Sequence, residues 1–391
     1  MWKPAFFLAL SLAPIAQAQT SQTQQTPQEL VQDAIEKQRT GDLQGAVSEY
    51  REFLKMHPEA TTIHSNLGAA LAGLGRFEEA ILEYKMALKQ SPGLESARLN
   101  LGLVYYKMGQ ISQAAGEFEK VHAKNPDNSQ ATLLLADSYL RIGREKDVIR
   151  ILLPEEHKRP DDLAVAYMLG IAYIRDKQPE QGAPRIDRIL RNGDSAEAHL
   201  LLGMTKFQAL EYPAAIADLT KAAEMNPDLP DVYSYLGQAQ MESGDMIAAR
   251  ASFEKELARN PNEFESNLRL AILLKQDGDY DRAHQLLKRA LLVRPDDPAA
   301  LYQVGSTDLA AGNLDAARIV FEQVVKQSPN FLEAHVSLAQ VYYRLKRKVD
   351  GDREREIVQK LKAEQDAAQQ KQKGDVSDPS KSTQPPPQSA N

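Results

Sequence analysis

Residues 66–92 read NLGAALAGLGRFEEAILEYKMALKQSP, and residues 100–126 read NLGLVYYKMGQISQAAGEFEKVHAKNP. Both stretches begin with Asn-Leu-Gly, then place an alanine, an aromatic residue and a closing proline at the same intervals. They start 34 residues apart, and a fixed period of this length indicates a stacked array of similar structural units. The closing prolines keep this 34-residue interval in two series, which are Pro58, Pro92, Pro126 and Pro160, and then Pro227, Pro261, Pro295 and Pro329.

We number the positions of each repeat so that its closing proline is position 32. In this numbering, the pattern of each repeat predicts two antiparallel helices. Positions 8 and 20 hold small residues, such as Gly68 and Ala80, which let two helix backbones approach closely, and the aromatic residue at position 24 fills the space beside them. Proline at position 32 ends the second helix, because proline lacks the N–H that would continue it. Glycine at position 15 suits a left-handed residue that ends the first helix. This glycine recurs as Gly41, Gly75, Gly109, Gly143, Gly244, Gly278 and Gly312.

The pattern resembles the tetratricopeptide repeat, L-G-x2-Y…A-x3-F…P. This resemblance implies an all-α fold, an α-solenoid of stacked antiparallel helix pairs that coils into a right-handed superhelix. We expect about nine repeats and a C-terminal capping helix. The predicted repeats are residues 27–60, 61–94, 95–128, 129–162, 163–195, 196–229, 230–263, 264–297 and 298–331.

The two ends of the chain fall outside the repeats. Residues 1–18 read as a cleaved export signal, with Lys3, a short apolar run and the small-x-small site Ala16-Gln17-Ala18. Residues 19–26 form a polar linker. We predict a capping helix at 332–349, a polar helix at 350–373 and a disordered tail rich in Pro, Ser and Gln at 374–391. Open solenoids present apolar ends, so self-association through these ends is a further expectation.

Several prolines predict departures from regular helix geometry. Pro154 falls within one second helix, and Pro179 and Pro184 fall within the next. An internal proline costs about 3 kcal/mol or bends a helix, so we expect short or bent helices there. Pro27, Pro230 and Pro298 occupy position 1, where a missing N–H costs little.

Composition and motifs argue against catalysis and cofactors. The chain carries a net charge of −7 and no cysteine, so it offers neither a basic surface for nucleic acid nor thiolate metal ligands. Its seven histidines show no metal-ligand spacing. No phosphate-binding, nucleophile-elbow or metalloprotease motif is present. We therefore predict a protein that is not an enzyme, holds no cofactor and has no membrane span once the signal is cleaved.

The resemblance implies that partner segments lie on the concave face, which is lined by first-helix positions 2, 5, 6, 9, 12 and 13. Asn66 and Asn100 share position 6, where an amide can pair with an extended backbone, although a purely structural role stays equally open. The central part of this face is apolar, and it either binds a partner or is buried by tightening of the coil. The predicted groove residues are Asn66, Asn100, Leu134, Tyr167, Met168, Ile171, Leu201, Met204, Phe207 and Tyr235.

These features together predict a non-catalytic interaction scaffold of a bacterial cell envelope, with a protein or peptide partner in the concave groove. The export signal predicts the periplasm, with secretion as the alternative. The competing function is a periplasmic assembly factor or chaperone for clients of the envelope or export machinery. A scaffold would bind one stoichiometric partner, whereas a chaperone would bind many unfolded clients weakly.

Overall fold

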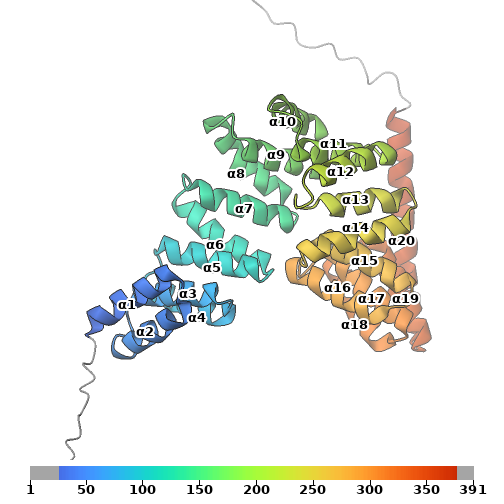
Figure 1. The fold of residues 1–391 in the computed structure, drawn as a ribbon. Coiled ribbons are helices and arrows are strands. Elements are labelled where there is room, and N and C mark those ends of the chain that lie inside the picture. The colour runs from blue at the N-terminus through green and yellow to red at the C-terminus, as the bar shows by residue number, and fades with distance from the viewer. Residues whose placement is uncertain (1–25, 377–391) are drawn as a thin grey trace, which may run out of the picture. The chain divides into compact units, whose positions relative to one another are not determined.

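The computed structural model describes residues 26–376, with side chains to Ala367. The predicted signal at 1–18, nearly all of the linker at 19–26 and most of the predicted tail at 374–391 lie outside the described residues. Within 26–376 the structure is made of twenty α-helices and no strand, which confirms the all-α solenoid prediction (Figure 1). The helices fall into two compact units, Met1–Leu94 and Glu95–Asn391.

The N-terminal unit consists of two helix pairs within its described part. Its helices are α1 (Pro27–Thr40), α2 (Leu43–Met56), α3 (Thr61–Gly73) and α4 (Phe77–Gln90). Thr26 and Glu29 form a capping box at the start of α1, which satisfies backbone N–H groups that have no partner inside the helix.

The C-terminal unit contains the other sixteen helices, stacked in chain order. Figure 1 shows this stack running from α5 to α10 and then back from α11 toward α18. Its first eight helices are α5 (Glu95–Lys107), α6 (Ile111–Lys124), α7 (Ser129–Arg141), α8 (Glu145–Lys158), α9 (Leu163–Arg175), α10 (Pro179–Arg191), α11 (Ala196–Gln208) and α12 (Tyr212–Met225). The others are α13 (Val232–Glu242), α14 (Met246–Arg259), α15 (Phe264–Gln276), α16 (Tyr280–Val293), α17 (Pro298–Ala311), α18 (Leu314–Gln327), α19 (Leu332–Arg344) and α20 (Lys348–Val376).

Close packing within a pair depends on the small residue at position 8. A Cβ added to Gly237 would lie 2.6 Å from the ring of Phe253, the position-24 aromatic residue on the paired helix. Phe253 has no exposed surface, so its ring occupies the space that the glycine leaves. The spacing of small and aromatic residues in the sequence therefore corresponds to direct packing of one helix on its partner.

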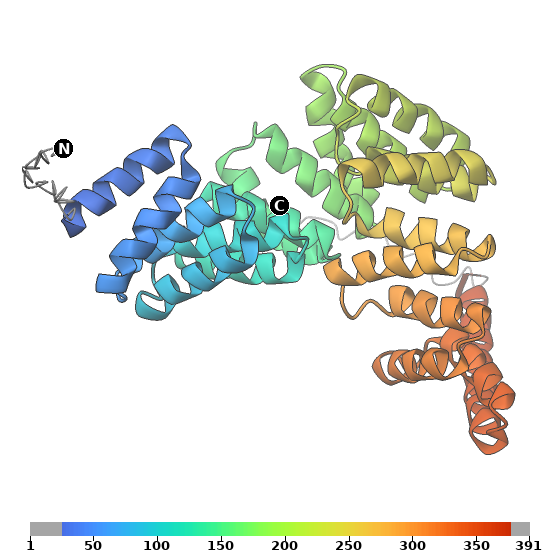
Figure 2. The same ribbon diagram turned by 60° about the horizontal axis from the view of Figure 1, so that its bottom comes forward.

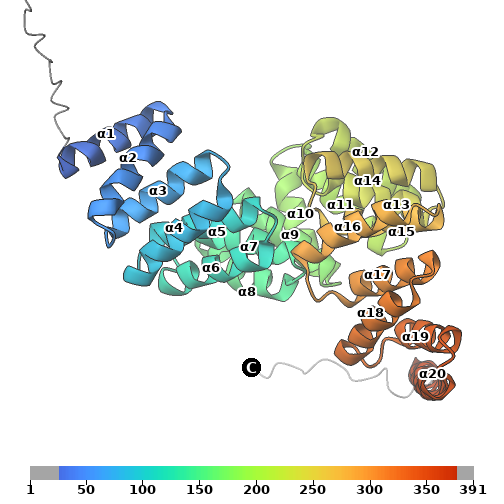
Figure 3. The same ribbon diagram turned by 90° about the horizontal axis from the view of Figure 1, so that it is seen from below.

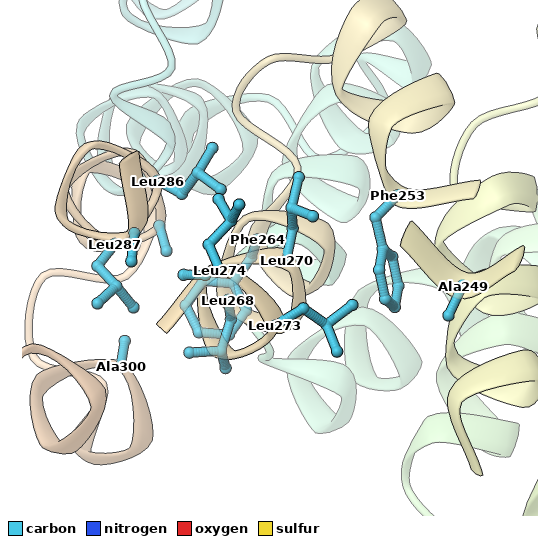
Figure 4. Close-up of a cluster of buried hydrophobic side chains, with 13 residues drawn as sticks. Ala249, Phe253, Phe264, Leu268, Leu270, Leu273, Leu274, Leu286, Leu287 and Ala300 are labelled. Carbon is cyan, nitrogen blue, oxygen red and sulfur yellow. The ribbon is translucent and has the colours of Figure 1, made fainter. Parts of the chain in front are cut away.

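Stacking of successive pairs buries a continuous apolar layer. Figure 4 shows part of this layer around α15, with Ala249 and Phe253 of α14 on one side and Leu287 and Ala300 on the other. Each first helix thus contacts its own second helix and the neighbouring pairs, as expected of a repeat array.

The turn at position 15 is left-handed whether or not it holds glycine. All seven predicted glycines have φ between 74° and 92°. Lys177, Leu210 and Lys346 take the same place in three other repeats, with φ of 59°, 63° and 61°. A side chain in this conformation is strained, by about 1 kcal/mol per residue, so the array enforces the turn even where the sequence disfavours it.

The proline-containing helices are not short. α8 has 14 residues around Pro154 and α10 has 13 residues with Pro184 inside, lengths that match the other helices. A buried ion-pair cluster joins these two helices. Glu156 is buried on α8 and accepts hydrogen bonds from Arg185 (2.5 Å) and Arg188 (2.9 Å) of α10.

Pro230 does not begin a helix, contrary to the prediction. α13 starts at Val232, because Asp231 adopts a left-handed conformation with φ of 66°. At the C-terminal end, α19 ends at Arg344 rather than 349, and one helix runs from Lys348 to Val376.

α19 and α20 form a tenth helix pair, so the last repeat is more than a single cap. A Cβ on Gly351 would lie 2.7 Å from the Tyr343 ring, which places a small residue against a first helix as in the other pairs. His335 Nδ1 lies 2.6 Å from Glu354 Oε2. Figure 3 views α20 nearly end-on beside α19. The helix that the sequence predicted as separate and polar therefore begins as the second helix of a repeat.

Candidate partner-binding surface

The structure divides the predicted groove residues into two classes. Ile171, Leu201 and Met204 are buried, with exposed fractions of 6%, 0% and 1%. Leu201 packs against Gly170 of the preceding first helix. These three side chains therefore contribute to packing between helices, which is the alternative that the sequence left open. The half-buried residues are Asn66, Asn100, Leu134, Tyr167, Met168, Phe207 and Tyr235.

Tyr167 lines an apolar pocket of about 400 Å³ between α9, α10 and α11, here called the α9–α11 pocket. The Asp162 side chain accepts hydrogen bonds from Ala164 N (3.0 Å) and Val165 N (3.2 Å), which fixes the start of α9. Leu163 at this start is 38% exposed. The full lining is Leu163, Ala164, Tyr167, Ile189, Asn192, Gly193, Ser195, Glu197 and Leu229.

A pocket of this size and lining can accept an apolar side chain from another molecule. Its volume lies within the roughly 300–1,000 Å³ typical of ligand pockets. Ile189 and Leu229 are 5% and 6% exposed, so they form a firm apolar floor, while Leu163 stands at the rim. Phe207, further along α11, packs its ring 5.8 Å from that of Tyr212.

Tyr235 belongs to a polar cluster on the inner helices that sequence reasoning missed. Arg175 on α9 donates to Tyr235 Oη (2.7 Å), to the Leu140 carbonyl (3.0 Å) and to Asp231 Oδ2 (3.0 Å). The left-handed turn at Asp231 places this carboxylate beside the guanidinium. We call Arg175, Asp231, Tyr235, Glu256 and Glu263 the inner polar cluster.

Two carboxyl groups of this cluster have raised pKa values. Glu256 is 2% exposed, and burial, reinforced by the carboxylates of Asp231 and Glu263, raises its pKa to about 8. Its Oε1 accepts from Asp231 N at 3.3 Å, whereas its Oε2 has no partner. Burial and the Asp231 charge also raise the pKa of Glu263. No local sequence signal marks these residues, because the cluster forms only when Arg175 of one repeat meets the polar residues of another, 230–263.

In the N-terminal unit, Asn66 takes part in a local network. The Tyr50 hydroxyl donates to Gln38 Oε1 at 2.9 Å. Burial raises the pKa of Tyr50, and a side-chain hydrogen bond between Tyr50 and Asn66 acts in the opposite direction. A side chain already engaged within its own unit has less capacity for a partner backbone. This contact favours the structural role of Asn66 over the peptide-binding one.

The three histidines at position 4 form a recurring structural pair. Nδ1 of His64, His199 and His335 contacts a carboxylate 19 residues later, at distances of 2.6, 2.9 and 2.6 Å. The carboxylates belong to Glu83, Asp218 and Glu354 on the paired second helices. Over the described part of the chain, no group of three or more His, Cys, Asp or Glu residues could hold a metal ion. These histidines tie the two helices of a repeat together.

None of the helices within residues 26–376 combines the length and the apolar character that a membrane span requires. Two features of the described residues suit the binding of a partner, the apolar α9–α11 pocket and the charged and hydroxyl groups of the inner polar cluster.

Comparison with known proteins agrees with this architecture. A family model described as "Tetratricopeptide repeat" matches residues 33–95, 200–264, 268–330 and 305–368, which together exceed half of the chain. A second model of the same description matches residues 105–158. The matched segments stop at 158 and resume at 200, so they leave out α9 and α10.

Individual relatives are similar over short stretches. Tetratricopeptide repeat protein 8 of Caenorhabditis elegans is 31% identical over 112 residues, which are 28% of this chain and 22% of that protein. Protein CTR9 homolog of Arabidopsis thaliana is 30% identical over 129 residues, 33% of this chain and 12% of that protein. The chain thus covers less than a quarter of either relative.

Among solved structures, a chain of the APC/C hetero-tetramer Cut9–Hcn1 aligns with a TM-score of 0.54 and 14% identity, over 86% of this chain and 87% of that chain. At this identity the similarity shows the fold alone. The repeat spacing, the stacked helix pairs and the family models agree, and the chain belongs to the tetratricopeptide repeat family.

Proposed function

We propose that this protein is an exported interaction scaffold of a bacterial cell envelope that binds a partner segment on its inner face. Proteins of this family are protein-binding scaffolds, which supports the general role. The observation that carries the proposal is the α9–α11 pocket, an apolar cavity beside Tyr167 with the exposed Leu163 at its rim. A preformed pocket loses little entropy of ordering when a partner binds.

The pocket favours a partner segment that presents a bulky apolar side chain. Tyr167, Ile189 and Leu229 supply apolar contact area, and Ser195 and Glu197 at the start of α11 provide polar edges. Burial of one Leu- or Phe-sized side chain contributes about 1.5–3 kcal/mol, so such an anchor would dominate a short interface.

Site-specific photocrosslinking tests this assignment. A photoreactive residue at Leu163 should crosslink one partner in envelope extracts, and the same residue at Ile247 should not, because Ile247 is 86% exposed on α14 and lies outside the pocket lining. Leu163→Glu should abolish the crosslink from a second reactive residue at Asn192. Equal crosslinking from Leu163 and Ile247 would contradict a defined site, and many crosslinked clients would favour the chaperone function.

The prediction that the protein is exported depends only on residues 1–18, and it can be tested separately from the pocket. Expression of the full chain in a Gram-negative host should give a periplasmic product that begins at Gln19. A cytoplasmic product that retains Met1 would refute the envelope assignment and leave the scaffold function standing.

A further inference from the structure

Glu197 is the only charged residue in the lining of the α9–α11 pocket, and every other lining residue is uncharged. It lies in the first turn of α11 and is half-buried. Among the described side chains, no basic residue forms an ion pair with its carboxylate, and no donor forms a hydrogen bond with it. The pocket therefore holds a partly desolvated carboxylate that has no counter-ion from the protein.

The dipole of α11 compensates this carboxylate only in part. A helix N-terminus carries about half of a positive charge, so about half of the charge of Glu197 stays uncompensated. The start of α9 also borders the pocket, but it already holds the Asp162 carboxylate, which pairs with Arg159 at 3.0 Å. The end of α10, at Asn192 and Gly193, adds the negative end of a third helix. On this balance the pocket keeps a net negative charge.

The chain segments that form the pocket have the same sign of charge. We considered the residues within two positions of each lining residue. In these segments the carboxyl groups of Asp161, Asp187 and Glu197 form no ion pair among the described side chains, and Arg191 is the one cation that forms none. The surroundings of the pocket therefore favour a cationic ligand over an anionic one.

Tyr167 brings a second polar group without a partner to the pocket. Its hydroxyl forms no hydrogen bond with any residue in the described part of the chain. Burial raises the pKa of Tyr167, and the carboxylates of Asp231 and Glu197 raise it further against the opposing charge of Arg175. The charge of Glu197 thus acts at the phenol oxygen, within a largely apolar space. The neutral hydroxyl can accept a hydrogen bond from an ammonium or guanidinium group.

The pocket lies at the link where the series of closing prolines is interrupted. The link between α10 and α11 has Gly193, with φ of 129°, in place of a closing proline. Figure 2 shows the green and yellow-green part of the stack to which these helices belong. The repeat pattern does not specify the residues of this link, so the charge of the pocket is a property of this particular chain.

We propose that the α9–α11 pocket selects a partner segment in which a basic residue stands next to the apolar anchor. The anchor fills the space between Tyr167, Ile189 and Leu229, and the ammonium or guanidinium group pairs with Glu197 at the edge. A half-buried carboxylate gains more from a cation than an exposed one, because water and salt screen its charge less. This inference rests on the proposed function for the place of the partner, and it adds the charge that the partner carries.

Fluorescent probes that differ only at one end test the charge preference without any partner. Dansylcadaverine, dansyl-ε-aminocaproic acid and N-pentyl dansylamide carry the same ring on an alkyl chain that ends in an ammonium, a carboxylate and a methyl group. Dansyl emission rises in apolar surroundings, so titration of each probe with the full chain gives a Kd. The ammonium probe should bind about tenfold more tightly than the carboxylate probe, with the uncharged probe between them.

Variants assign the preference to Glu197 and the binding to the pocket. Glu197→Gln removes the charge and keeps the shape of the side chain, so the Kd values of the ammonium and carboxylate probes should come within about twofold of each other. Glu224→Gln is the matched control, because Glu224 is an exposed carboxylate on α12 outside the lining, and it should leave the preference unchanged. Ala164→Phe fills the pocket without adding a charge and should abolish binding of every probe.

The outcomes separate this inference from the proposed function. Equal affinity of the native protein for the ammonium and carboxylate probes would overturn the charge preference and leave the pocket as a binding site, and so would an unchanged preference in Glu197→Gln. If no probe binds, or if Ala164→Phe changes nothing, the pocket assignment fails together with the inference. If Glu197→Gln loses helical circular dichroism, the comparison of the probes on the native protein still decides.

The photocrosslinking at Leu163 gives an independent check on the chemistry of the partner. A captured segment should carry a lysine or arginine beside the crosslinked apolar residue. A captured segment with acidic residues in that place would overturn the charge preference, although the pocket would remain the place of binding.

Discussion

The buried carboxyl group of Glu256 makes stability depend on pH in a predictable direction. Its pKa is raised from 4.5 to about 8, so the folded protein binds a proton that the unfolded chain releases above pH 4.5. Stability is therefore expected to fall as pH rises from about 4.5 to about 8, and to level off above that. One pKa unit is equivalent to about 1.4 kcal/mol, so the loss between pH 5 and pH 8 is about 4 kcal/mol at most.

Glu256→Gln removes this ionisation while keeping the shape of the protonated acid. The remaining side-chain oxygen can still accept from Asp231 N, as Oε1 does in the native protein. We expect the variant and the native protein to have similar free energies of unfolding at pH 5. At pH 8 the variant should be more stable by several kcal/mol, because the native protein then holds an ionised, buried carboxylate.

Urea unfolding followed by circular dichroism between pH 5 and pH 9 measures this difference. Glu254→Gln is the matched control, because Glu254 is exposed on the same helix and should leave the pH dependence as in the native protein. The reasoning is refuted if Glu256→Gln has the same pH dependence as the native protein. A variant that is less stable than the native protein at every pH would indicate that the carboxylate is stabilised in the folded state.

Three further predictions concern packing, ion pairs and the last repeat. Gly237→Ala should destabilise the fold by about 1–3 kcal/mol in thermal or urea unfolding, because its Cβ would meet an aromatic ring at 2.6 Å. The control Gly116→Ala has open space around the new methyl group and should stabilise α6 by about 0.5–1 kcal/mol. Glu156→Ala should cost about 3 kcal/mol, since it leaves the guanidinium of Arg185 without its carboxylate, and equal stability of the variant in urea would contradict this. Truncation before Lys348 should lower the melting temperature and promote aggregation, because it uncovers the apolar face of α19. A truncated protein with an unchanged melting temperature that is monomeric by light scattering would argue against a tenth pair.

The repeat spacing predicted the fold because it reports contacts that are local in sequence. The small residue at position 8 and the aromatic residue at position 24 of one repeat lie within 16 residues of each other and pack directly, as Gly237 and Phe253 do. The tenth repeat escaped prediction because it departs from the pattern. Position 15 is Lys346 and position 24 is Arg355, so only Gly351 at position 20 marked its second helix.

The candidate site was predicted in part. Tyr167 lies in the α9–α11 pocket as a half-buried residue, but its neighbours Leu201 and Ile171 are core residues. Sequence position alone cannot separate these cases. Whether a first-helix residue faces the groove or the next repeat depends on the rotation between neighbouring pairs, and the sequence pattern does not specify that rotation.

The amino-acid sequence by itself determined the helix pairs, their number to within one and their order, because each pair is specified within 34 residues. Only the tertiary structure decided the contact of Arg294 with the end of α7 and the inner polar cluster. Arg294 meets the end of α7 across 153 residues because small rotations between successive repeats accumulate along the coil. Arg175 meets Asp231 and Tyr235 of a later repeat for the same reason, and no local sequence pattern specifies the accumulated rotation.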